Sequence, residues 1–329
     1  MRILITGCAG FIGYSLTKKV LELGHEVIGI DNLSEYEGIP SLKYKNIKEL
    51  SDHSKFEFIK LDVVNDAFTS ILKGKKLDIT VHLAGRDLFY NDSDDLKYTP
   101  FLITNVIGTS KIFELANELG SKRFIYASTY SVYGQVKKQV LTEKKILPKP
   151  ISPHGASKLA AEQIVYFMSN YFKIPSLILR MFTVYGPGMK TYTFIPLVIR
   201  KLLNNQPIDF SHSKYANRDF LFVDDVVNSI ISGFKKRLKF QTINIASGDS
   251  YTMEEIALKI AKIMNKDKSL VQFNKHKKDF TKIVMKDAKA NIDRARKVLD
   301  YQSNVGIDEG LEKTVKWFLD NQHLLEGIK

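Results

Sequence analysis

The chain has 329 residues, of which 44% are hydrophobic and 11% aromatic, and these proportions exclude a disordered protein. Its length allows one large doubly wound domain together with a smaller second unit. The net charge is +13, but the basic residues are dispersed and no nucleic-acid-binding motif accompanies them, so we expect an anionic small substrate and no nucleic acid.

The cysteine and histidine content argues against an internal disulfide and against a metal site. Cys8 is the single cysteine, so no internal disulfide forms and a reducing compartment is expected. The seven histidines are scattered without metal-ligand spacing, so we predict no metal site. Because the sequence shows neither a leader pattern nor an apolar run of membrane length, we expect a cytoplasmic protein with no membrane contact.

The first thirteen residues predict a nucleotide-binding turn. Residues 3–5 are typical of a buried parallel strand, and glycines follow at Gly7, Gly10 and Gly13 before a helix begins. Glycine lets the chain leave the strand tightly, lets backbone N–H groups approach a pyrophosphate, and lets the helix pack on the strand. The helix N-terminus then favours the phosphate charge.

A second strand, over residues 27–30, ends at Asp31 and completes a βαβ unit. A carboxylate at this point can accept hydrogen bonds from both ribose hydroxyls of an adenosine, and it would repel a 2′-phosphate. The sequence therefore predicts NAD rather than NADP as the cofactor.

Two further strands end in residues that suit a ligand site. The third strand, over residues 56–61, ends in Asp62, which is expected either to reach an adenine amino group or to cap a helix. The fourth, over residues 79–83, ends in Ala84 and Gly85, and small residues there leave room for a ligand lying across the sheet.

Hydroxyl groups gather after the fifth strand. Residues 100–119 predict a long helix, and the strand at 124–127 delivers the hydroxyl-rich segment 128–134 to its carboxyl end. Hydroxyls at the carboxyl edge of a central strand lie where substrate chemistry takes place in such sheets.

The next helix opens within residues 152–158 and continues to 172, and it carries His154 and Lys158 on one face. A strand at 177–179 completes an alternating pattern of six strands, which predicts an α/β fold with a doubly wound parallel sheet. We expect residues 1–180 to form this domain and residues 181–329 to form a smaller substrate-binding domain.

Beyond residue 180 the pattern loosens into a turn-rich crossing and alternating short elements. The strand at 242–245 is expected to return to the first domain, and Thr252 with Glu255 forms a capping box. Helices are expected over 194–203, up to 234, up to 264, over 290–299 and over 308–321, with short strands at 208–210 and near 271.

These ordered motifs resemble the extended short-chain dehydrogenase/reductase family, and within it the NAD-dependent nucleotide-sugar epimerases and dehydratases. The resemblance implies a Rossmann domain that holds NAD and a smaller C-terminal domain that closes over the nucleotide of a nucleotide-diphosphate sugar. It covers nearly the whole chain, at residues 6–13, 31–32, 82–84, 105, 128–134, 185–187, 218–220 and 244–246.

The resemblance also implies contacts. Those with the cofactor come from Gly7, Gly10, Phe11, Ile12, Gly13, Asp31, Asn32, Asp62, Val63, Leu83, Ala84, Gly85, Asn105 and Lys158. Those with the substrate come from Arg86, Thr129, Tyr130, Thr183, Arg218 and Lys278. Arg218 would contact the diphosphate, and Lys277 or Lys278 would stand in for a second arginine that has no clear counterpart.

In that family a Tyr-x-x-x-Lys pair and a nearby Ser or Thr carry the proton chemistry. The tyrosine takes a proton from a sugar hydroxyl as hydride passes to the nicotinamide, while the lysine binds the nicotinamide ribose and lowers the tyrosine pKa. Lys158 and Thr129 match two of these positions. His154 stands where the family has tyrosine.

The substitution leaves two hypotheses open. An imidazole with a pKa of about 6.5 is already a base at neutral pH, and Lys158 would keep it neutral. The ring nitrogens extend less far from the backbone than a phenol hydroxyl does, which argues against the imidazole as the base. His154 is therefore either the working base or a helix-start residue in an altered site, with Tyr130 and Tyr133 as nearby substitutes, of which Tyr133 is expected to pack in the core or against nicotinamide.

The two residues after Thr129 narrow the type of reaction. Tyr130 and Ser131 stand where the 4,6-dehydratases of the family have an Asp-Glu pair, which argues against dehydration. The resemblance is strongest to UDP-glucuronate and UDP-galactose 4-epimerases. It implies an NAD-dependent 4-epimerase or C4 oxidoreductase working through a 4-keto intermediate, and a homodimer paired through residues 100–119 and 154–172. The alternatives are a dehydratase and a non-catalytic NAD-binding homologue.

Overall fold

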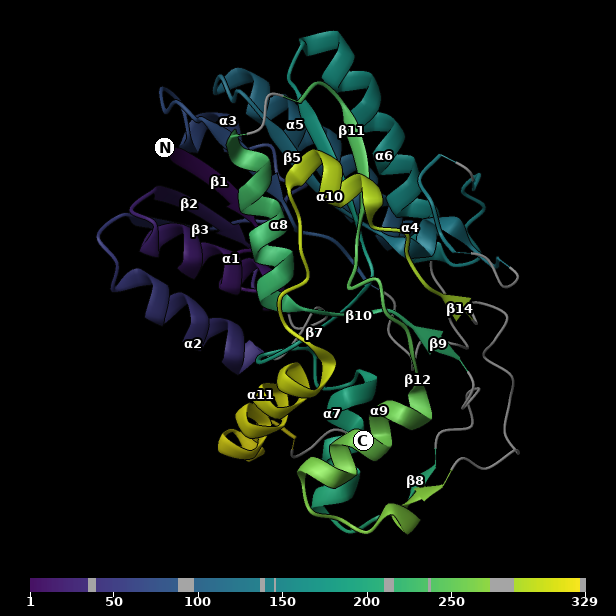
Figure 1. Ribbon diagram of the computed structural model, residues 1–329. Coiled ribbons are helices and arrows are strands. Elements are labelled where there is room, and N and C mark those ends of the chain that lie inside the picture. Colours follow the sequence, from purple (N-terminus) through teal and green to yellow (C-terminus); the bar gives the residue numbers. More distant parts are fainter. Residues whose placement is uncertain are drawn as a thin grey trace.

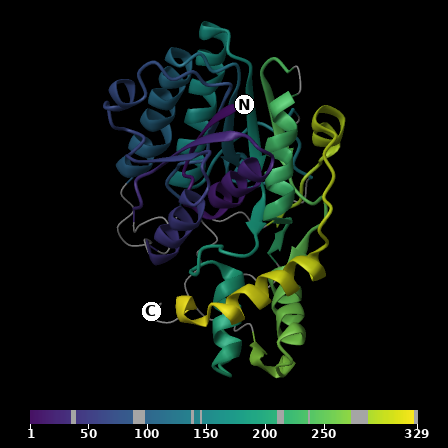
Figure 2. The ribbon, with the colours of Figure 1, turned by 90° about the vertical axis from the view of Figure 1, so that its left-hand side faces the viewer.

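The computed structural model describes residues 1–34, 40–87, 98–136, 140–144, 146–209, 216–235, 238–272 and 287–325. A large parallel sheet is covered by helices on both faces, and a smaller unit lies below it in the view of Figure 1 (Figures 1 and 2). Among the described residues, no helix combines the length and the apolar character needed to cross a bilayer. The cytoplasmic location stays a prediction.

The large sheet contains seven parallel strands in the order β11-β6-β5-β4-β1-β2-β3. The strand order reverses between β1 and β4, and a crevice for ligands opens at the carboxyl ends of strands at such a switch point. The predicted doubly wound α/β fold is confirmed. The strands are β1 (Arg2–Thr6), β2 (Glu26–Asp31), β3 (Phe56–Lys60), β4 (Ile79–His82), β5 (Phe124–Thr129), β6 (Ser176–Met181) and β11 (Gln241–Ile245).

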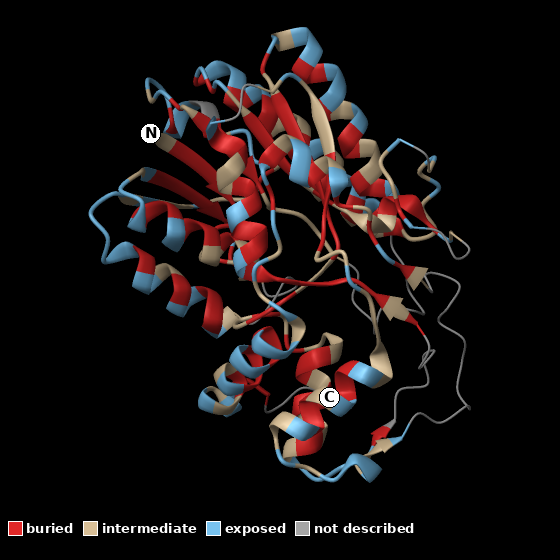
Figure 3. Ribbon diagram, in the orientation of Figure 1, coloured by how far each residue is buried: buried red, intermediate tan, exposed pale blue. Residues whose placement is uncertain are grey.

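Alternate residues of each strand pack against different helices, as the period of two requires. Ile3 and Ile5 of β1 belong to one core, and Leu4 belongs to the core on the opposite face. Figure 3 shows the strands buried between helices whose outer faces are exposed. The first face carries α1 (Phe11–Glu22), α2 (Pro40–Ser51), α8 (Val223–Lys235) and α10 (Asp293–Leu299), and the second carries α3 (Phe68–Ile71), α5 (Gly108–Glu118) and α6 (Pro153–Phe172).

The smaller unit has a core of its own, formed by α7 (Phe194–Leu203), α9 (Met253–Ile263) and α11 (Ile307–Asp320). The chain leaves this unit to form β11, which pairs with β6 at the edge of the large sheet. Short elements complete it: β7 (Thr183–Tyr185), β8 (Ile208–Asp209), β9 (Asn217–Arg218), β10 (Phe220–Phe222), β12 (Tyr251–Thr252), β13 (Val271–Gln272), β14 (Asp287–Ala288), η4 (Lys268–Leu270) and η6 (Gln322–Leu325).

The helix predicted over residues 100–119 is present from Thr99 to Glu118, with a π-helical turn within it. It is divided into α4 (Thr99–Leu102), a π-helical turn η2 (Ile103–Ile107) and α5. Such a turn holds one residue more than an α-helical turn and is frequent at functional sites. It carries Asn105, whose side chain is buried and bonded to the loop after β4. The extra residue thus places an amide beside the ends of the central strands.

Candidate active site

A cleft of about 620 Å³ lies between the carboxyl ends of the central strands and the smaller unit. Asn105 lies behind the cleft rather than in its lining, and Lys278 lies outside the described residues. Most predicted site residues line the cleft: Gly7, Gly10, Phe11, Ile12, Gly13, Asp31, Asn32, Asp62, Val63, Leu83, Ala84, Gly85, Arg86, Thr129, Tyr130, His154, Lys158, Thr183 and Arg218.

The glycine turn is shaped for close backbone approach. Gly7 has a φ of +73°, which favours glycine, and its N–H donates to the Ile30 carbonyl at 2.7 Å. A β-carbon on Gly13 would overlap the Gly7 carbonyl oxygen, so only glycine lets α1 pack this closely on the turn. Gly10 is the N-cap of α1, and the cap makes no side-chain hydrogen bond to the first N–H groups of the helix. These groups fit a pyrophosphate.

Asp31 is held in place by the backbone and by a lysine. Its Oδ2 accepts from Ala9 N at 3.1 Å, and its Oδ1 accepts from Leu33 N at 2.8 Å. The ammonium of Lys43 lies 3.6 Å from Oδ1, and both side chains are buried. Lys43 therefore offsets part of the negative charge on which the predicted discrimination against a 2′-phosphate depends, an effect that the sequence did not reveal.

Asp62 does not cap a helix, because α3 begins with Ala67 as its N-cap. Its Oδ1 accepts from Val64 N at 3.1 Å within a turn, and its Oδ2 accepts from Asn32 Nδ2 at 2.7 Å. The helix-capping hypothesis is wrong at this position. Asp62 lines the cleft next to Asn32, where the adenine contact was predicted.

Lys158 reaches the strand ends from α6. Its Nζ donates to the carbonyl of Ala127 at 2.9 Å, and the side chain is buried. A β-carbon on Gly85 would lie 2.8 Å from this Nζ. The space left by Gly85 is thus filled in part by an ammonium group of the protein.

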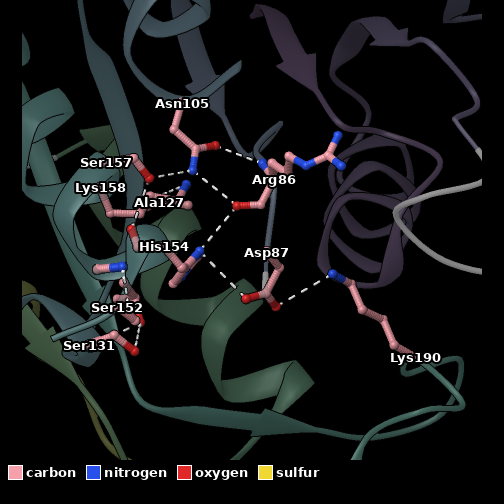
Figure 4. Close-up of polar contacts among 12 residues, drawn as sticks. Arg86, Asp87, Asn105, Ala127, Ser131, Ser152, His154, Ser157, Lys158 and Lys190 are labelled. Atoms are coloured by element: carbon pink, nitrogen blue, oxygen red, sulfur yellow. Dashed lines mark hydrogen bonds and ion pairs between the residues drawn. The ribbon is translucent and has the colours of Figure 1, made fainter. Parts of the chain in front are cut away.

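His154 follows Ser152, the N-cap of α6, and Pro153 at the first helical position. Its imidazole is 13% exposed and lies in the cleft lining. Nδ1 is 3.1 Å from the carbonyl oxygen of Arg86 and 3.5 Å from Oδ1 of Asp87 (Figure 4). Because a carbonyl can only accept, Nδ1 is assigned the proton and Nε2 the lone pair.

The surroundings of His154 keep it neutral. Burial lowers its pKa below the usual value, and this effect outweighs the raising influence of Asp87; Lys158 also lowers the pKa. At neutral pH the Nε2 lone pair is therefore available to accept a proton.

Thr129 and the neighbouring tyrosines have different surroundings. Thr129 Oγ1 accepts from Ser131 N at 3.1 Å, at the start of η3 (Tyr130–Tyr133), and lines the cleft. Tyr130 also lines the cleft and stacks on Phe182, with ring centroids 5.2 Å apart.

Tyr133 is a core residue. It is buried, donates to Asn244 Oδ1 at 2.7 Å, and lies under the guanidinium of Arg180 at 4.8 Å. Burial raises its pKa to about 12. This confirms the prediction that it packs in the core, and it leaves Tyr130 as the tyrosine of this segment that faces the cleft.

The Asn105 side chain joins the loop after β4 to α6. Its Oδ1 accepts from Arg86 N at 2.7 Å, and its Nδ2 donates to Arg86 O at 3.0 Å and to Ser157 Oγ at 2.9 Å. The amide thereby fixes the same Arg86 carbonyl that accepts the hydrogen bond from His154 Nδ1 (Figure 4). The cofactor contact predicted for Asn105 stays a prediction, since the side chain contacts Arg86 and Ser157 and does not line the cleft.

A buried histidine links Asn105 to the glycine turn. Thr109 donates to the Asn105 carbonyl at 2.6 Å, so its oxygen accepts from His82 Nε2 at 3.0 Å. His82 Nδ1 then accepts from Thr6 Oγ1 at 2.6 Å. Burial lowers the pKa of His82 to about 3, which keeps the ring neutral as this order of donors requires.

A buried ion pair that sequence reasoning missed supports the ends of β5 and β6. Arg180 donates twice to Glu162, at 2.9 and 2.7 Å, and Ser128 Oγ donates to the same carboxylate at 2.5 Å. Glu162 lies one turn beyond Lys158 on α6, which was the available signal. The group joins α6 to both strands.

Arg218 in β9 lines the cleft from the side of the smaller unit, as expected for a diphosphate contact, and Thr183 lines it from β7. Lys190, in the segment between β7 and α7, approaches from the same side and pairs with Asp87. Sequence reasoning missed Asp87 and Lys190; the position of Asp87 directly after Arg86 was the one signal. Among the described residues, no cluster of three or more metal-ligating side chains occurs.

Residues 3–246 match the model of the family described as the NAD dependent epimerase/dehydratase family. The chain belongs to this family. Membership of an NAD-dependent family confirms NAD as the cofactor, in agreement with the shape of the glycine turn and with the position of Asp31.

The chain is similar both to 4-epimerases and to 4,6-dehydratases of this family. The UDP-glucuronate 4-epimerase of Thermodesulfobacterium geofontis is 29% identical over 99% of this chain and 98% of its own length. The UDP-glucuronic acid 4-epimerase of Bacillus cereus, solved with UDP-glucuronic acid and NAD, has a TM-score of 0.88 at 29% identity, covering 98% of this chain and 100% of that one. A dTDP-glucose 4,6-dehydratase of Bacillus anthracis, solved with NAD, has a TM-score of 0.85 at 25% identity and full coverage of both chains.

Proposed function

We propose that the chain is an NAD-dependent nucleotide-sugar 4-epimerase or C4 oxidoreductase that acts on a UDP-type sugar, with His154 as its general base. The observation that carries this proposal is the convergence of Thr129, His154 and Lys158 on the cleft that also contains the dinucleotide turn. The full-length similarity to UDP-glucuronate 4-epimerases supports the class of substrate.

NAD, when bound, supplies the acceptor and later the donor of the hydride at C4 of the sugar. The residues of this chain handle the accompanying proton. With the proton of Nδ1 donated to the Arg86 carbonyl, Nε2 of His154 accepts the proton of the C4 hydroxyl, directly or through one bridging water. The hydroxyl becomes a carbonyl, and the same proton returns when C4 is reduced from its other face.

Lys158 and Thr129 prepare the site for this step. The Lys158 ammonium, held by the Ala127 carbonyl, lowers the pKa of His154 and so keeps the ring neutral before the proton is transferred. The Thr129 hydroxyl, which accepts a hydrogen bond from Ser131 N at the end of β5, orients the sugar hydroxyl in this proposal. Arg218 supplies the positive charge for the diphosphate.

One observation favours each of two other candidate functions, a dehydratase and a non-catalytic NAD-binding protein. The similarity to dTDP-glucose 4,6-dehydratases favours a dehydratase. Tyr130 and Ser131 after Thr129 argue against it, because the 4,6-dehydratases of the family have an Asp-Glu pair at these two positions for protonation and water loss. A non-catalytic NAD-binding protein is suggested by His154 in place of tyrosine, and the presence of Lys158, Thr129 and Arg218 in the cleft argues against that hypothesis.

The decisive experiment incubates the protein and NAD with UDP-, GDP- and dTDP-sugars, beginning with UDP-glucuronic acid. Absorbance of reduced nicotinamide and chromatography of the sugar products are followed. We expect the C4 epimer or a 4-keto product from a UDP-sugar. Binding of NAD without turnover of any sugar nucleotide would favour the non-catalytic protein, and loss of water from dTDP-glucose would establish a dehydratase.

We further propose that two copies pair through α4, η2 and α6. These neighbouring elements expose large apolar side chains, each about half exposed or more, as protein interfaces do in an isolated subunit. They are Leu102, Ile107, Tyr166, Phe167 and Tyr171. Sedimentation at micromolar concentration should give twice the chain mass of 37.5 kDa. A monomer under these conditions removes the proposal.

A further inference from the structure

Asp87 lies between His154 and a lysine that comes from the segment between β7 and α7. Its Oδ1 is 3.5 Å from Nδ1 of His154, and its Oδ2 is 3.5 Å from Nζ of Lys190 (Figure 4). One carboxylate therefore faces an imidazole with one oxygen and an ammonium with the other. The Asp87 side chain is 49% exposed and lines the cleft, so a bound ligand can alter both contacts.

The carboxylate stands on the side of the ring where its charge assists a base. Nδ1 holds the proton because the Arg86 carbonyl, 3.1 Å away, can only accept. A negative charge beside Nδ1–H favours this tautomer, and it stabilises the imidazolium that forms when Nε2 takes a proton. This is the pairing in which a carboxylate orients a catalytic histidine in hydrolases.

We propose that Asp87 is a positioning residue that keeps the His154 proton on Nδ1 and strengthens Nε2 as a base, and that Lys190 competes for the same carboxylate. The inference rests on the proposed role of His154 as the base and deepens it. In this chain an Asp–His pair takes the place of the single tyrosine of the family.

The shared carboxylate also couples base strength to occupancy of the cleft. An anionic substrate group, whether a phosphate or a sugar carboxylate, that binds the Lys190 ammonium weakens the hold of Lys190 on Asp87. The carboxylate charge then acts more fully on His154. The base is therefore weaker in the empty cleft and stronger when the anionic substrate is bound.

Five influences act on the pKa of the His154 ring. Burial and the positive charges of Lys158 and Lys190 lower its pKa, whereas Asp87 and the Arg86 carbonyl raise it. Removal of Asp87 and removal of Lys190 must therefore change the pKa in opposite directions. A purely structural role for either residue does not predict opposite signs.

The test is an NMR titration of the histidine rings in the NAD complex, in which the His154 signals are identified by their loss in His154→Asn. We expect Asp87→Asn to lower the pKa of His154 by about 1, as for a partly screened charge at this distance. Lys190→Gln should raise it by about 0.5, because its charge acts from farther away. Lys316→Gln and Asp320→Asn are matched controls, since this exposed pair on α11 makes the same kind of contact at 3.1 Å.

Addition of UDP-glucuronic acid should raise the His154 pKa in the wild type and leave it nearly unchanged in Lys190→Gln. If UDP-glucose has the same effect, the diphosphate is the anionic group. If UDP-glucose has none, it is the sugar carboxylate. In turnover assays, the acid limb of kcat/KM, which reports the free enzyme, should move with the titrated pKa in each variant.

An unchanged His154 pKa in Asp87→Asn, or a fall in Lys190→Gln, overturns the proposal. Absence of any substrate effect in the wild type overturns the coupling to occupancy. These readings need no turnover. If both variants shift the pKa as expected while no sugar nucleotide reacts, the proposed function fails and the charge relation between Asp87, His154 and Lys190 stands.

Discussion

Replacement of His154 by asparagine tests the base assignment with little change in the surroundings. The amide nitrogen of asparagine lies close to the position of Nδ1 and can still donate to the Arg86 carbonyl, now 3.1 Å from Nδ1. The atom that is lost is Nε2, the acceptor of the proton. The contact that fixes the start of α6 to the loop after β4 is thereby kept, and only the base is removed.

The expected loss follows from the worth of a positioned base. Such a group contributes about 10²- to 10⁴-fold, which corresponds to about 3 to 5 kcal/mol of transition-state stabilisation. His154→Asn should therefore lower kcat by at least about 100-fold. NAD affinity should stay within about twofold, because the glycine turn and Asp31 are untouched and a distant substitution has small effects.

The assay is conversion of UDP-glucuronic acid with NAD, followed by chromatography between pH 5 and 8. Burial holds the pKa of His154 below its usual value, so wild-type activity should be level near pH 7 and fall as the pH drops through that lowered pKa. The residual activity of His154→Asn should lack this acid limb. NAD affinity is measured by titration calorimetry.

His154→Tyr provides the contrast. It introduces a phenol that Lys158 can activate beside Thr129, and it should bring little gain if the imidazole is already the base. A rise of about 100-fold would mean that His154 marks an impaired site. Retention of more than about a tenth of wild-type activity in His154→Asn would refute the base assignment, because a positioned base contributes far more.

Three further substitutions test the support of the site. Gly85→Ala places a methyl group 2.8 Å from Lys158 Nζ, so the ammonium must move. In the same assay kcat should fall by about 100-fold, as for a misplacement of about 1 Å. An unchanged kcat would show that Lys158 tolerates displacement. Arg180→Met leaves the buried Glu162 carboxylate without its cation and should lower the free energy of unfolding by about 3 to 5 kcal/mol, measured by urea denaturation. A loss below about 1 kcal/mol would contradict the paired arrangement. Lys43→Met removes the ammonium that offsets Asp31 and should widen the preference for NAD over NADP, measured by calorimetry; NADP binding as tight as NAD in the wild type would contradict the ribose assignment.

Local sequence patterns predicted much of the dinucleotide-binding fold. The glycines of the first turn, the apolar runs of the strands and Asp31 at the end of β2 depend on neighbours within one βαβ unit, so their spacing alone predicts their geometry. The π-helical turn within the helix over 100–119 could not be predicted in this way. The turn carries Asn105, whose side chain bonds to Arg86 and Ser157, and both of these residues are distant from it in sequence.

The sequence by itself determined the dinucleotide fold, the NAD cofactor and the presence of a histidine at the base position, because motif spacing and residue type settle these. Only the tertiary structure decided what surrounds that histidine. Asp87 follows β4, Lys190 lies between β7 and α7, and the Arg86 carbonyl is fixed by Asn105. The protonation state of an imidazole depends on the charges within a few ångströms of it, and chain folding alone brings those charges together.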